Sequence, residues 1–429
     1  MFKSKVSFLN QGCRLNASET ATLESVFANG GYNVVNDTSS SDICVVNTCT
    51  VTENSDKDTR RLVNRLVREN PEVKIALIGC LSQVKKEALA ELPNVQWIVG
   101  NQGKMDLLSV IESGESSDDA SVHMPKFSTE VFTQPTADQD RHHCRANLKI
   151  QDGCDNFCSF CIIPFARGPA RSRSFTDIMT EARTLVASGH QELVLTGVNI
   201  GTYEDEAYRF ADVVEELNSI SGLKRLRISS IEPTTIPDRV LNLIGPDSVL
   251  TPYFHIPIQS GTDAVLSAMR RRYSIQEFVD GLQAITDRLP LACIGTDIIT
   301  GFPGETDEQH AETMALMSQL PLAYFHVFSY SERSLAHSRK FGNKVAPTVI
   351  KRRSEDLRLL SATKRFTYHS KYLNQEADVL FEQSKKGHWV GLTRNFIKVK
   401  VKSGRDLTNQ ILPVKLVACN SEDMDGLLL

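Results

Sequence analysis

Apolar and polar positions alternate in an α/β rhythm over residues 1–112. Short apolar runs that predict strands are followed by longer segments with the 3.6-residue period of a helix. The expected strands cover residues 6–9, 43–47, 73–78 and 96–99, and the expected helices cover residues 17–29, 56–69 and 83–92. Strands that alternate with helices predict a parallel sheet covered on both faces, which is an α/β sandwich.

The same rhythm returns in residues 142–369. The expected strands cover residues 148–151, 192–196, 225–228, 254–258, 291–298 and 323–328, and the expected helices cover residues 174–188, 208–220, 236–244, 275–289 and 308–320. Six strands with crossover helices predict a parallel sheet that curls into a partial (β/α)6 barrel, similar to a TIM barrel. In such barrels the chemistry lies at the carboxyl ends of the strands, in the loops that lead into the helices.

Residues 370–429 change to strands alone. Residues 377–381, 389–392, 396–401 and 411–417 alternate or are β-branched, with glycines at the turns, which predicts a small OB-like β-barrel. Lys398, Lys400 and Lys402 alternate and therefore share one face of a strand. Such a row, with Trp389 and Phe396 nearby, suits an RNA backbone, although a solvated polar face explains it equally well.

Composition and charge set the broad class. Of 429 residues, 41% are hydrophobic and 23% are charged, as in ordinary globular proteins. The net charge of −4 means that any RNA contact must use local basic patches. The polar residues 113–141 lack a sustained period and predict a linker. We find no signal-peptide pattern and no apolar run near the roughly 20 residues of a membrane helix, so the ten cysteines indicate a reducing, cytoplasmic location.

Three cysteines follow the first expected barrel strand. Cys154, Cys158 and Cys161 form a C-x3-C-x2-C pattern. Three thiolates on one short loop can hold a cubane iron–sulfur cluster, which normally takes four, and leave one iron free for a substrate or cofactor. The alternative is a structural zinc loop. Zinc in such sites has four ligands, usually in C-x2-C pairs, and no fourth ligand has a matching spacing.

Three more cysteines lie just past the ends of strands in the first segment. They are Cys13, Cys49 and Cys80. Sites in open parallel sheets form outside the carboxyl ends of the strands, where residues far apart in the sequence converge. A second thiol-ligated site is therefore one interpretation. Three buried core thiols are the other, because free cysteine is often buried.

The cysteine motifs carry a family resemblance. The C-x3-C-x2-C loop resembles that of radical S-adenosylmethionine (SAM) enzymes, and its continuation, CIIP at 161–164 and RG at 167–168, resembles the methylthiotransferase branch. The tail ARGPARSR at 166–173 is most similar to members that act on threonylcarbamoyladenosine in tRNA. GCRLN at 12–16, NTC at 47–49 and GC at 79–80 match the motifs of the methylthiotransferase N-terminal domain. The resemblance covers nearly the whole chain.

The resemblance implies two [4Fe–4S] clusters and SAM. The cysteine loop would hold the cluster that passes an electron to SAM. Cys13, Cys49 and Cys80 would hold a second cluster, whose open iron carries the sulfur destined for the product. Loops at the barrel rim would bind SAM, and the candidate residues are Gly197, Asn199, Ser229, Glu232, Gln259 and Asp297.

The implied reaction converts N6-threonylcarbamoyladenosine at position 37 of a tRNA to its 2-methylthio derivative. A 5′-deoxyadenosyl radical is needed because the adenine C2–H bond is too unreactive for acid–base chemistry, and a second SAM supplies the methyl group. The implied partners are the tRNA anticodon loop and a one-electron reductant such as flavodoxin or ferredoxin. The C-terminal segment resembles a TRAM domain, an RNA-binding module, and residues 391–395 fit its motif.

Three alternatives stay open. Two lie within the family, an isopentenyladenosine tRNA methylthiotransferase and a methylthiotransferase of ribosomal protein S12. The third, of a different class, is a non-enzymatic RNA-binding metalloprotein. SAM cleavage under reducing conditions separates an enzyme from a binding module.

Overall fold

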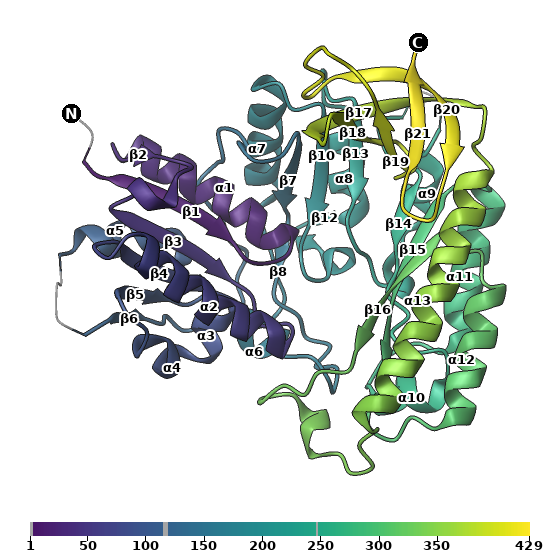
Figure 1. Ribbon diagram of the computed structural model, residues 1–429, viewed down its shortest axis with the longest axis horizontal. Helices are drawn as coiled ribbons and strands as arrows, with labels where there is room; N and C mark the ends of the chain where they lie inside the picture. Colours follow the sequence, from purple (N-terminus) through teal and green to yellow (C-terminus); the bar gives the residue numbers. More distant parts are fainter. Residues whose placement is uncertain (1–2, 115–118, 246–247) are drawn as a thin grey trace.

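Three units follow one another along the chain in the computed structural model, which describes residues 3–114, 119–245 and 248–429 (Figure 1). The first is a parallel sheet with the strand order β2-β1-β3-β4-β5-β6. Its strands are β1 (Lys5–Asn10), β2 (Asn33–Val34), β3 (Ile43–Thr48), β4 (Lys74–Gly79), β5 (Val95–Val99) and β6 (Ser121–His123). Its helices are α1 (Arg14–Asn29), α2 (Glu53–Glu69), α3 (Cys80–Val84), α4 (Lys86–Ala90) and α5 (Leu107–Glu112).

The two faces of this sheet explain the apolar runs in its sequence. Cys44 and Val46 of β3 pack in one buried cluster, whereas Val45 packs in another cluster with Ile43. Alternate residues of one strand therefore face different cores, as expected for a parallel sheet covered on both sides. The sandwich is confirmed, but β2 and β6 were not predicted. Strand β6 extends the sheet into the segment expected to be a linker, of which residues 115–118 lie outside the described part of the chain.

The second unit is the expected partial barrel of six parallel strands. They are β7 (Arg145–Lys149), β10 (Glu192–Thr196), β13 (Arg225–Ile228), β14 (Tyr253–His255), β15 (Cys293–Thr300) and β16 (Tyr324–Ser329). Two three-stranded sheets, β13-β10-β7 and β14-β15-β16, are joined where Leu226 N–H donates to Val249 O at 2.8 Å and Thr251 N–H donates to Leu226 O at 2.9 Å. The short pairs β8 (Gln151–Asp152) with β9 (Arg171–Ser172), and β11 (Glu204–Asp205) with β12 (Tyr208–Arg209), are antiparallel.

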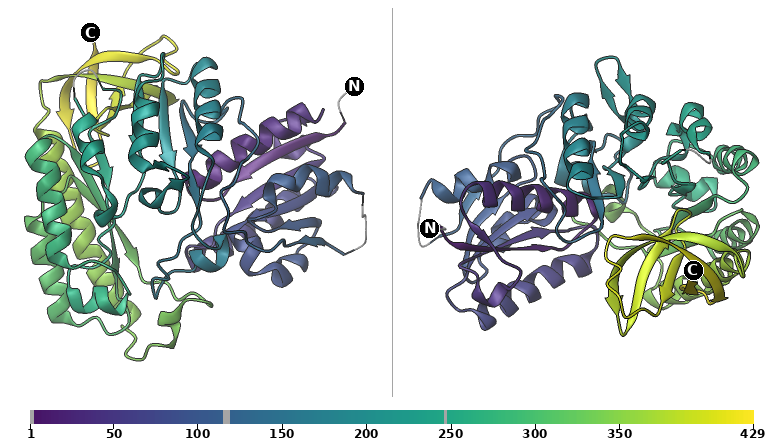
Figure 2. Two further views of the ribbon diagram at one scale, coloured as in Figure 1. Left: turned by 180° about the vertical axis from the view of Figure 1, so that it is seen from behind. Right: turned by 90° about the horizontal axis from the view of Figure 1, so that it is seen from above.

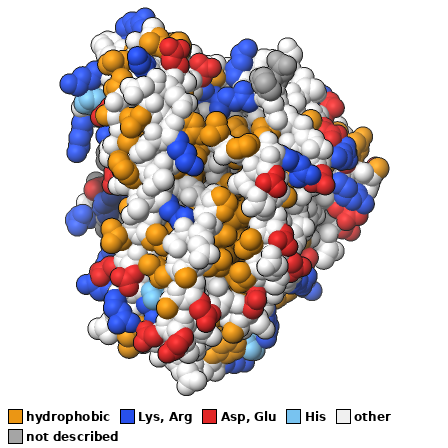
Figure 3. Space-filling view, turned by 90° about the vertical axis from the view of Figure 1, so that its right-hand side faces the viewer, with side chains coloured by type: hydrophobic (Ala, Val, Ile, Leu, Met, Phe, Trp, Pro, Cys, Tyr) orange, Lys and Arg blue, Asp and Glu red, His pale blue; other side chains and the backbone are white. Residues whose placement is uncertain are grey.

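Helices cover the outside of the barrel. They are α7 (Phe175–Ala187), α8 (Phe210–Asn218), α9 (Asp238–Leu243), α10 (Asp263–Ala268), α11 (Ile275–Arg288), α12 (Asp307–Gln319) and α13 (Pro347–Ser370). The short helix α6 (Ile163–Arg167) instead contacts α3 of the first unit. The sequence prediction missed α6, α10 and α13. The first unit packs on the barrel through α1 and β7, on the side away from α11, α12 and α13 (Figure 2). Figure 3 shows the α11–α13 side, where hydrophobic side chains gather in the middle and charged ones surround them.

The third unit is a closed β-barrel with the strand order β17-β18-β19-β21-β20. Its strands are β17 (Glu376–Lys385), β18 (His388–Thr393), β19 (Lys398–Val401), β20 (Ile411–Cys419) and β21 (Met424–Leu428). The OB-like prediction is confirmed as a five-stranded barrel, in which β21 was missed. No helix in the described part of the chain has the length and apolar character that a membrane span requires.

The row of lysines in the third unit, expected as a positively charged face with Phe396 nearby, has different surroundings in the structure. Lys398 and Lys400 both pair with Asp423, at 3.4 and 2.8 Å, so their charges are partly neutralised. Phe396 lies outside β19 and packs against Tyr253 of the central barrel, with 4.3 Å between ring centroids. Lysine spacing alone could not reveal an aspartate more than twenty residues away in the sequence.

Arginines dock the third unit on the second. The buried Arg225 donates from Nη1 to Leu392 O and from Nη2 to Asp378 O, both at 2.8 Å. Arg394, within the segment 391–395 that fits the TRAM motif, donates to Ser248 O at 2.6 Å. The contact between the two units is therefore built from charged donors and backbone carbonyl groups.

We expect Arg225→Leu to lower the free energy of unfolding by about 3 kcal/mol, because a charged donor contributes about 1.5–3 kcal/mol per hydrogen bond. Urea unfolding followed by circular dichroism measures the change. Arg239→Leu is the control, since Arg239 is exposed and pairs with Asp212 at 2.9 Å on the surface, where an ion pair contributes little to stability. Equal losses in both variants would contradict the docking role.

Candidate active site

The cysteine loop runs from the end of β8 to the start of α6, beyond the carboxyl end of β7. Gly153 opens it with a φ of +70°, and a Cβ at this position would collide with Pro169 O, so only glycine fits. Cys154 N–H donates to Gly168 O at 3.1 Å and Cys161 N–H donates to Cys158 O at 3.0 Å. These bonds fold the loop back on itself and bring its three thiols together.

The loop thiols need a cation to ionise. Burial raises the pKa of Cys154, and it raises the pKa of Cys161 to about 12. Arg271 donates from Nη1 to Cys158 Sγ at 3.3 Å, which places one positive charge at the loop. A metal centre would supply the rest, since thiolates are the form that binds iron. The donor set therefore fits an iron–sulfur cluster.

A cavity of about 180 Å³, here called the Cys158 cavity, lies beside this loop. Asn199 and Glu232 line it, and Glu232 forms an ion pair with Arg271. The Oδ1 atom of Asn199 is buried without a hydrogen-bond partner among the described residues. A buried unpaired acceptor is costly, so a ligand with a polar hydrogen fits this position. Two SAM candidates are thus placed beside a loop cysteine.

The first-unit cysteines lie at the carboxyl ends of three neighbouring strands. Cys13 precedes α1 after β1, Cys49 follows β3, and Cys80 opens α3 directly after β4. Burial raises the pKa of Cys49, and the nearby thiols of Cys80 and Cys13 raise it further. The structure therefore brings this trio together, as the strand-end argument predicted.

A buried charge network joins the trio to the cysteine loop. Glu19 of α1 pairs with Lys149 at 2.8 Å, with Arg167 at 3.0 Å, and with Lys104. Asp152 accepts from Lys149 at 2.7 Å and from Arg167 at 2.9 Å. Burial alone would raise the pKa of Glu19, but Arg167, Lys104 and Lys149 hold it below its ordinary value.

The network carries more cations than carboxylates. Burial lowers the pKa of Lys104 to about 8, and the neighbouring Arg167 and Lys149 lower it as well. Arg167 lies close enough to Cys80 and Cys13 that their thiolates raise its pKa, although burial opposes its charge. The excess positive charge therefore faces the first-unit trio, and it suits a thiolate-ligated, anionic group there.

Asn16 connects the same elements by hydrogen bonds. Its Oδ1 accepts from Arg167 Nη2 at 2.6 Å, and its Nδ2 donates to Asn47 Oδ1 and to Thr48 O, both at 3.0 Å. Cys13 Sγ lies 3.6 Å from Asn16 Oδ1. The strand end that carries Cys49, the turn that carries Cys13 and helix α6 are therefore fixed to one another.

The remaining SAM candidates lie in other cavities. Gly197, Ser229 and Asp297 line a chamber of about 460 Å³ together with Cys13, here called the Cys13 chamber. Gln259 lines a smaller cavity of about 210 Å³, which Asp297 also reaches. The loops after β10 and β13 contribute to both the Cys13 chamber and the Cys158 cavity. These loops therefore line both a cavity that reaches Cys13 and a cavity that reaches Cys158.

Comparison with known proteins identifies the family. Residues 148–317 match the radical SAM superfamily, and residues 5–100 match uncharacterized protein family UPF0004. The chain is 35% identical over 421 residues to the threonylcarbamoyladenosine tRNA methylthiotransferase MtaB of Bacillus subtilis (strain 168), across 96% of this chain and 93% of that protein. The chain belongs to the radical SAM methylthiotransferase family.

Other relatives and solved structures agree with this assignment. The MtaB of Aquifex aeolicus (strain VF5) is 33% identical, across 92% of this chain and 96% of that protein. The tRNA-2-methylthio-N(6)-dimethylallyladenosine synthase of Bacillus mycoides (strain KBAB4) is 30% identical, across 97% and 84%. The radical SAM methyltransferase TsrM from Kitasatospora setae, with tryptophan and a SAM analogue bound, shares the fold with a TM-score of 0.58 at 15% identity, across 76% and 73%.

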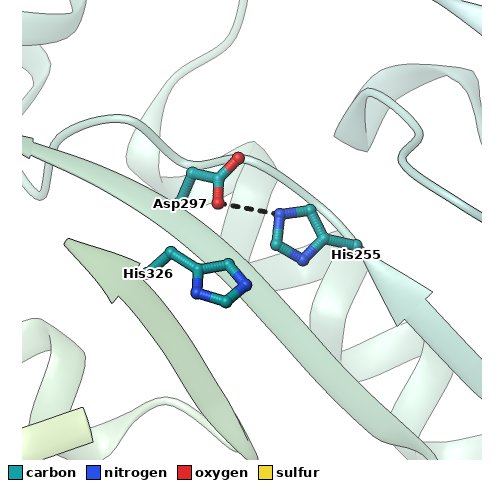
Figure 4. Close-up of side chains that lie close together, drawn as sticks. All are labelled: His255, Asp297 and His326. Atoms are coloured by element: carbon teal, nitrogen blue, oxygen red, sulfur yellow. Dashed lines mark ion pairs between the residues drawn. The ribbon is translucent and has the colours of Figure 1, made fainter. Parts of the chain in front are cut away.

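Sequence reasoning missed several polar residues at the mouth of this methylthiotransferase barrel. Arg271 belongs to a run of three arginines at 270–272, and it lies against Cys158 and Glu232. His255 and His326 lie beside Asp297 on adjacent strands (Figure 4). Each is a polar residue inside an apolar strand, FHI at 254–256 and FHV at 325–327, and this interruption is the signal that could have revealed them.

We expect Glu19→Gln to lower the free energy of unfolding of the cluster-free protein by about 3–5 kcal/mol, because it leaves buried cations uncompensated. Urea unfolding at pH 7 measures this loss. Glu112→Gln is the control, since Glu112 pairs with the exposed Lys3 at 2.6 Å, where a small loss is expected. A loss no larger than that of the control would show that the network does not stabilise the fold.

The same variant tests the charge state of Glu19. Its folded pKa lies below the ordinary 4.5, so its contribution to stability is complete above pH 4.5 and is lost as the pH falls further. The difference in unfolding free energy between the wild type and Glu19→Gln should therefore shrink between pH 6 and pH 3. A difference that stays constant over that range would mean that Glu19 is already neutral.

Proposed function

We propose that this methylthiotransferase acts on a tRNA and converts N6-threonylcarbamoyladenosine at position 37 to its 2-methylthio derivative. The carrying observation is the 35% identity to the Bacillus subtilis MtaB over nearly the full length of both chains. A second support is that the loops after β10 and β13 line both the cavity that contains Cys13 and the cavity that contains Cys158. Methylthiolation needs a radical source and a sulfur source near one base, and this arrangement offers a place for each.

The radical SAM family uses a [4Fe–4S] cluster and SAM. In the proposal, Cys154, Cys158 and Cys161 hold that cluster, and a second [4Fe–4S] cluster is held by Cys13, Cys49 and Cys80. When bound, the first cluster supplies the electron that cleaves SAM to methionine and a 5′-deoxyadenosyl radical.

The chain's own residues bind and shield the reactants. Arg271 holds a positive charge against Cys158 and is oriented by its ion pair with Glu232. Asn199 offers a free acceptor in the Cys158 cavity, and Gly197, Ser229, Gln259 and Asp297 complete the proposed SAM-binding set at the rim. Enclosure by these loops keeps water from the reacting groups and holds them in one orientation.

The proposal extends to partners and location. The anticodon loop of the tRNA is the proposed substrate partner, because an unpaired base can be splayed into a protein pocket. The closed C-terminal barrel serves as the TRAM-type RNA-binding domain. A flavodoxin- or ferredoxin-like protein supplies single electrons, and the tRNA substrate would place the protein in the cytoplasm.

Anaerobically reconstituted protein tests the substrate directly. We expect it to form 2-methylthio-threonylcarbamoyladenosine from SAM, a reductant, sulfide and a tRNA that carries threonylcarbamoyladenosine at position 37, detected by mass spectrometry of digested tRNA. The controls are the same tRNA with unmodified adenosine and a tRNA with isopentenyladenosine. Product from the isopentenyladenosine tRNA alone would replace the proposed substrate by the rival one.

Two cysteine variants test whether one trio serves SAM cleavage and the other serves sulfur insertion. Cys158→Ala should abolish formation of 5′-deoxyadenosine but keep about half of the iron, because only one trio is broken. Cys49→Ala should also lose about half of the iron, yet it should still cleave SAM without forming a methylthio nucleoside. Cys419→Ala is the control, since Cys419 belongs to neither trio. Full product from Cys49→Ala would show that the second cluster does not exist or is not used.

A further inference from the structure

The Cys13 chamber is built by all three units of the chain. Arg14 enters from α1, Asp297 and His326 come from the central barrel, and Phe396 comes from the C-terminal barrel. Tyr253, Phe396 and Tyr324 form an aromatic wall. The ring of Phe396 packs against that of Tyr253, and it lies nearly parallel to that of Tyr324 with 6.4 Å between the ring centroids. Aromatic side chains of this kind are suited to stack on an extruded base.

Arg14 brings to this chamber a charge that forms no ion pair with a carboxylate in the described part of the chain. Across residues 3–114, 119–245 and 248–429 it has no carboxylate within ion-pair distance, and its side-chain hydrogen bond goes to Asn147 Oδ1 at a long 3.4 Å. A half-buried guanidinium without a carboxylate is costly, and an anionic ligand would remove that cost.

The neighbouring arginines cannot play the same part. Arg227 donates from Nε to Glu192 at 2.6 Å, and Arg145 donates from Nε to Glu382 at 2.8 Å. Their charges are therefore already balanced by carboxylates of the protein. Arg14 lines the same chamber with its charge still available to a ligand.

His255 and His326 contribute polar groups to the lining of the Cys13 chamber. His255 Nε2 lies 2.9 Å from Asp297 Oδ1, so this pair is satisfied within the protein (Figure 4). His326 lies next to the pair on β16, with its side chain reaching the solvent at the chamber mouth while neighbouring protein surrounds its ring. The partial loss of solvent around the ring and the nearby His255 lower the pKa of His326, which leaves a neutral ring able to donate or accept one hydrogen bond.

A metal ion is the competing occupant of these three residues. Two histidines and a carboxylate within 4.8 Å of one another resemble a site for a divalent transition metal. However, the uncompensated Arg14 in the same chamber repels a cation, and the His255–Asp297 contact already satisfies two of the three groups. The charge of the chamber therefore favours an anion.

We infer that the Cys13 chamber recognises a carboxylate-bearing substituent on N6 of the target adenosine. In this arrangement Arg14 pairs with the carboxylate, and His326 hydrogen-bonds the polar part of the substituent. The inference rests on the proposed function and explains its choice of substrate. A threonylcarbamoyl group carries one carboxylate, whereas a dimethylallyl group is apolar and would leave Arg14 unpaired. Polar sites reject analogues that lack the matching group far better than apolar pockets do.

SAM also carries a carboxylate and must be distinguished from the base. The proposed SAM-binding residues are divided between two cavities: Asn199 and Glu232 line the Cys158 cavity, beside Arg271. Gly197, Ser229 and Asp297 line the Cys13 chamber together with Arg14, so the experiment must separate SAM from the base. A role for Arg14 in base recognition therefore predicts that the KM for SAM stays unchanged when Arg14 is replaced.

The test compares a substrate with and without its charge. We expect wild-type holoenzyme to use tRNA with threonylcarbamoyladenosine at position 37 on the order of 10- to 100-fold better, in kcat/KM, than the same tRNA with the carboxylate methyl-esterified. Arg14→Gln should lose this preference through a raised KM for the acid, and Arg14→Lys should retain most of it. Both should keep the wild-type KM for SAM. Direct binding of the two tRNAs to the holoenzyme, without turnover, should show the same pattern.

Controls separate this inference from the proposed function. Arg183→Gln, on the surface beside Glu216, should behave as wild type. His326→Phe should weaken binding of the tRNA with the free carboxylate without changing the iron content. It is the second test variant if Arg14→Gln fails to load iron. Equal use of acid and ester by the wild type would overturn the inference while leaving the proposed function intact. If neither the acid tRNA nor the ester tRNA gave product, the proposed function would be overturned instead. A raised KM for SAM in Arg14→Gln would assign Arg14 to SAM.

Discussion

The placement of Arg167 in the dry junction between α1 and α6 is the constraint on which the rest of this structure depends. Its guanidinium contacts Asn16, Glu19 and Asp152 at once, and these residues belong to two different units of the chain. Such a planar group with several fixed donors cannot satisfy all three partners unless the units adopt one relative position. The two cysteine trios inherit that position, because each begins within a few residues of a partner of Arg167.

The same junction has a charge that the protein does not balance by itself. The cations around Glu19 and Asp152 outnumber the carboxylates, and burial makes each uncompensated charge costly. The side toward Cys13 and Cys80 is where this excess would be relieved, since thiolates that ligate iron bring negative charge. The excess positive charge of the network and the negative charge of the proposed cluster would therefore stabilise each other. The network fixes the geometry of the trio, and the anionic cluster that we propose for the trio would complete the network.

Periodicity and strand-end logic predicted the barrel and the convergence of Cys13, Cys49 and Cys80, because both depend on short-range pattern and general topology. Elements whose existence depends on a distant partner were missed. Strand β6 has three residues and pairs only because β5 presents an open edge, and β21 closes a barrel whose other strands come earlier. Arg271 and His326 were not predicted for the same reason, because each is placed by a residue on another loop or strand. Arg271 contacts Cys158, and His326 lies beside Asp297.

The C-terminal barrel shows how a local motif can mislead about its partner. Arg394 sits in the segment that fits the RNA-binding TRAM motif, yet it donates to backbone carbonyls of the central barrel, and Phe396 lines the Cys13 chamber. Residues in this segment therefore position the domain, and they also shape the place where a base would enter. The RNA contact that we propose for this unit would then come from other exposed groups of the barrel. The docked orientation, which Arg225 and Arg394 fix, decides which of its faces remains available.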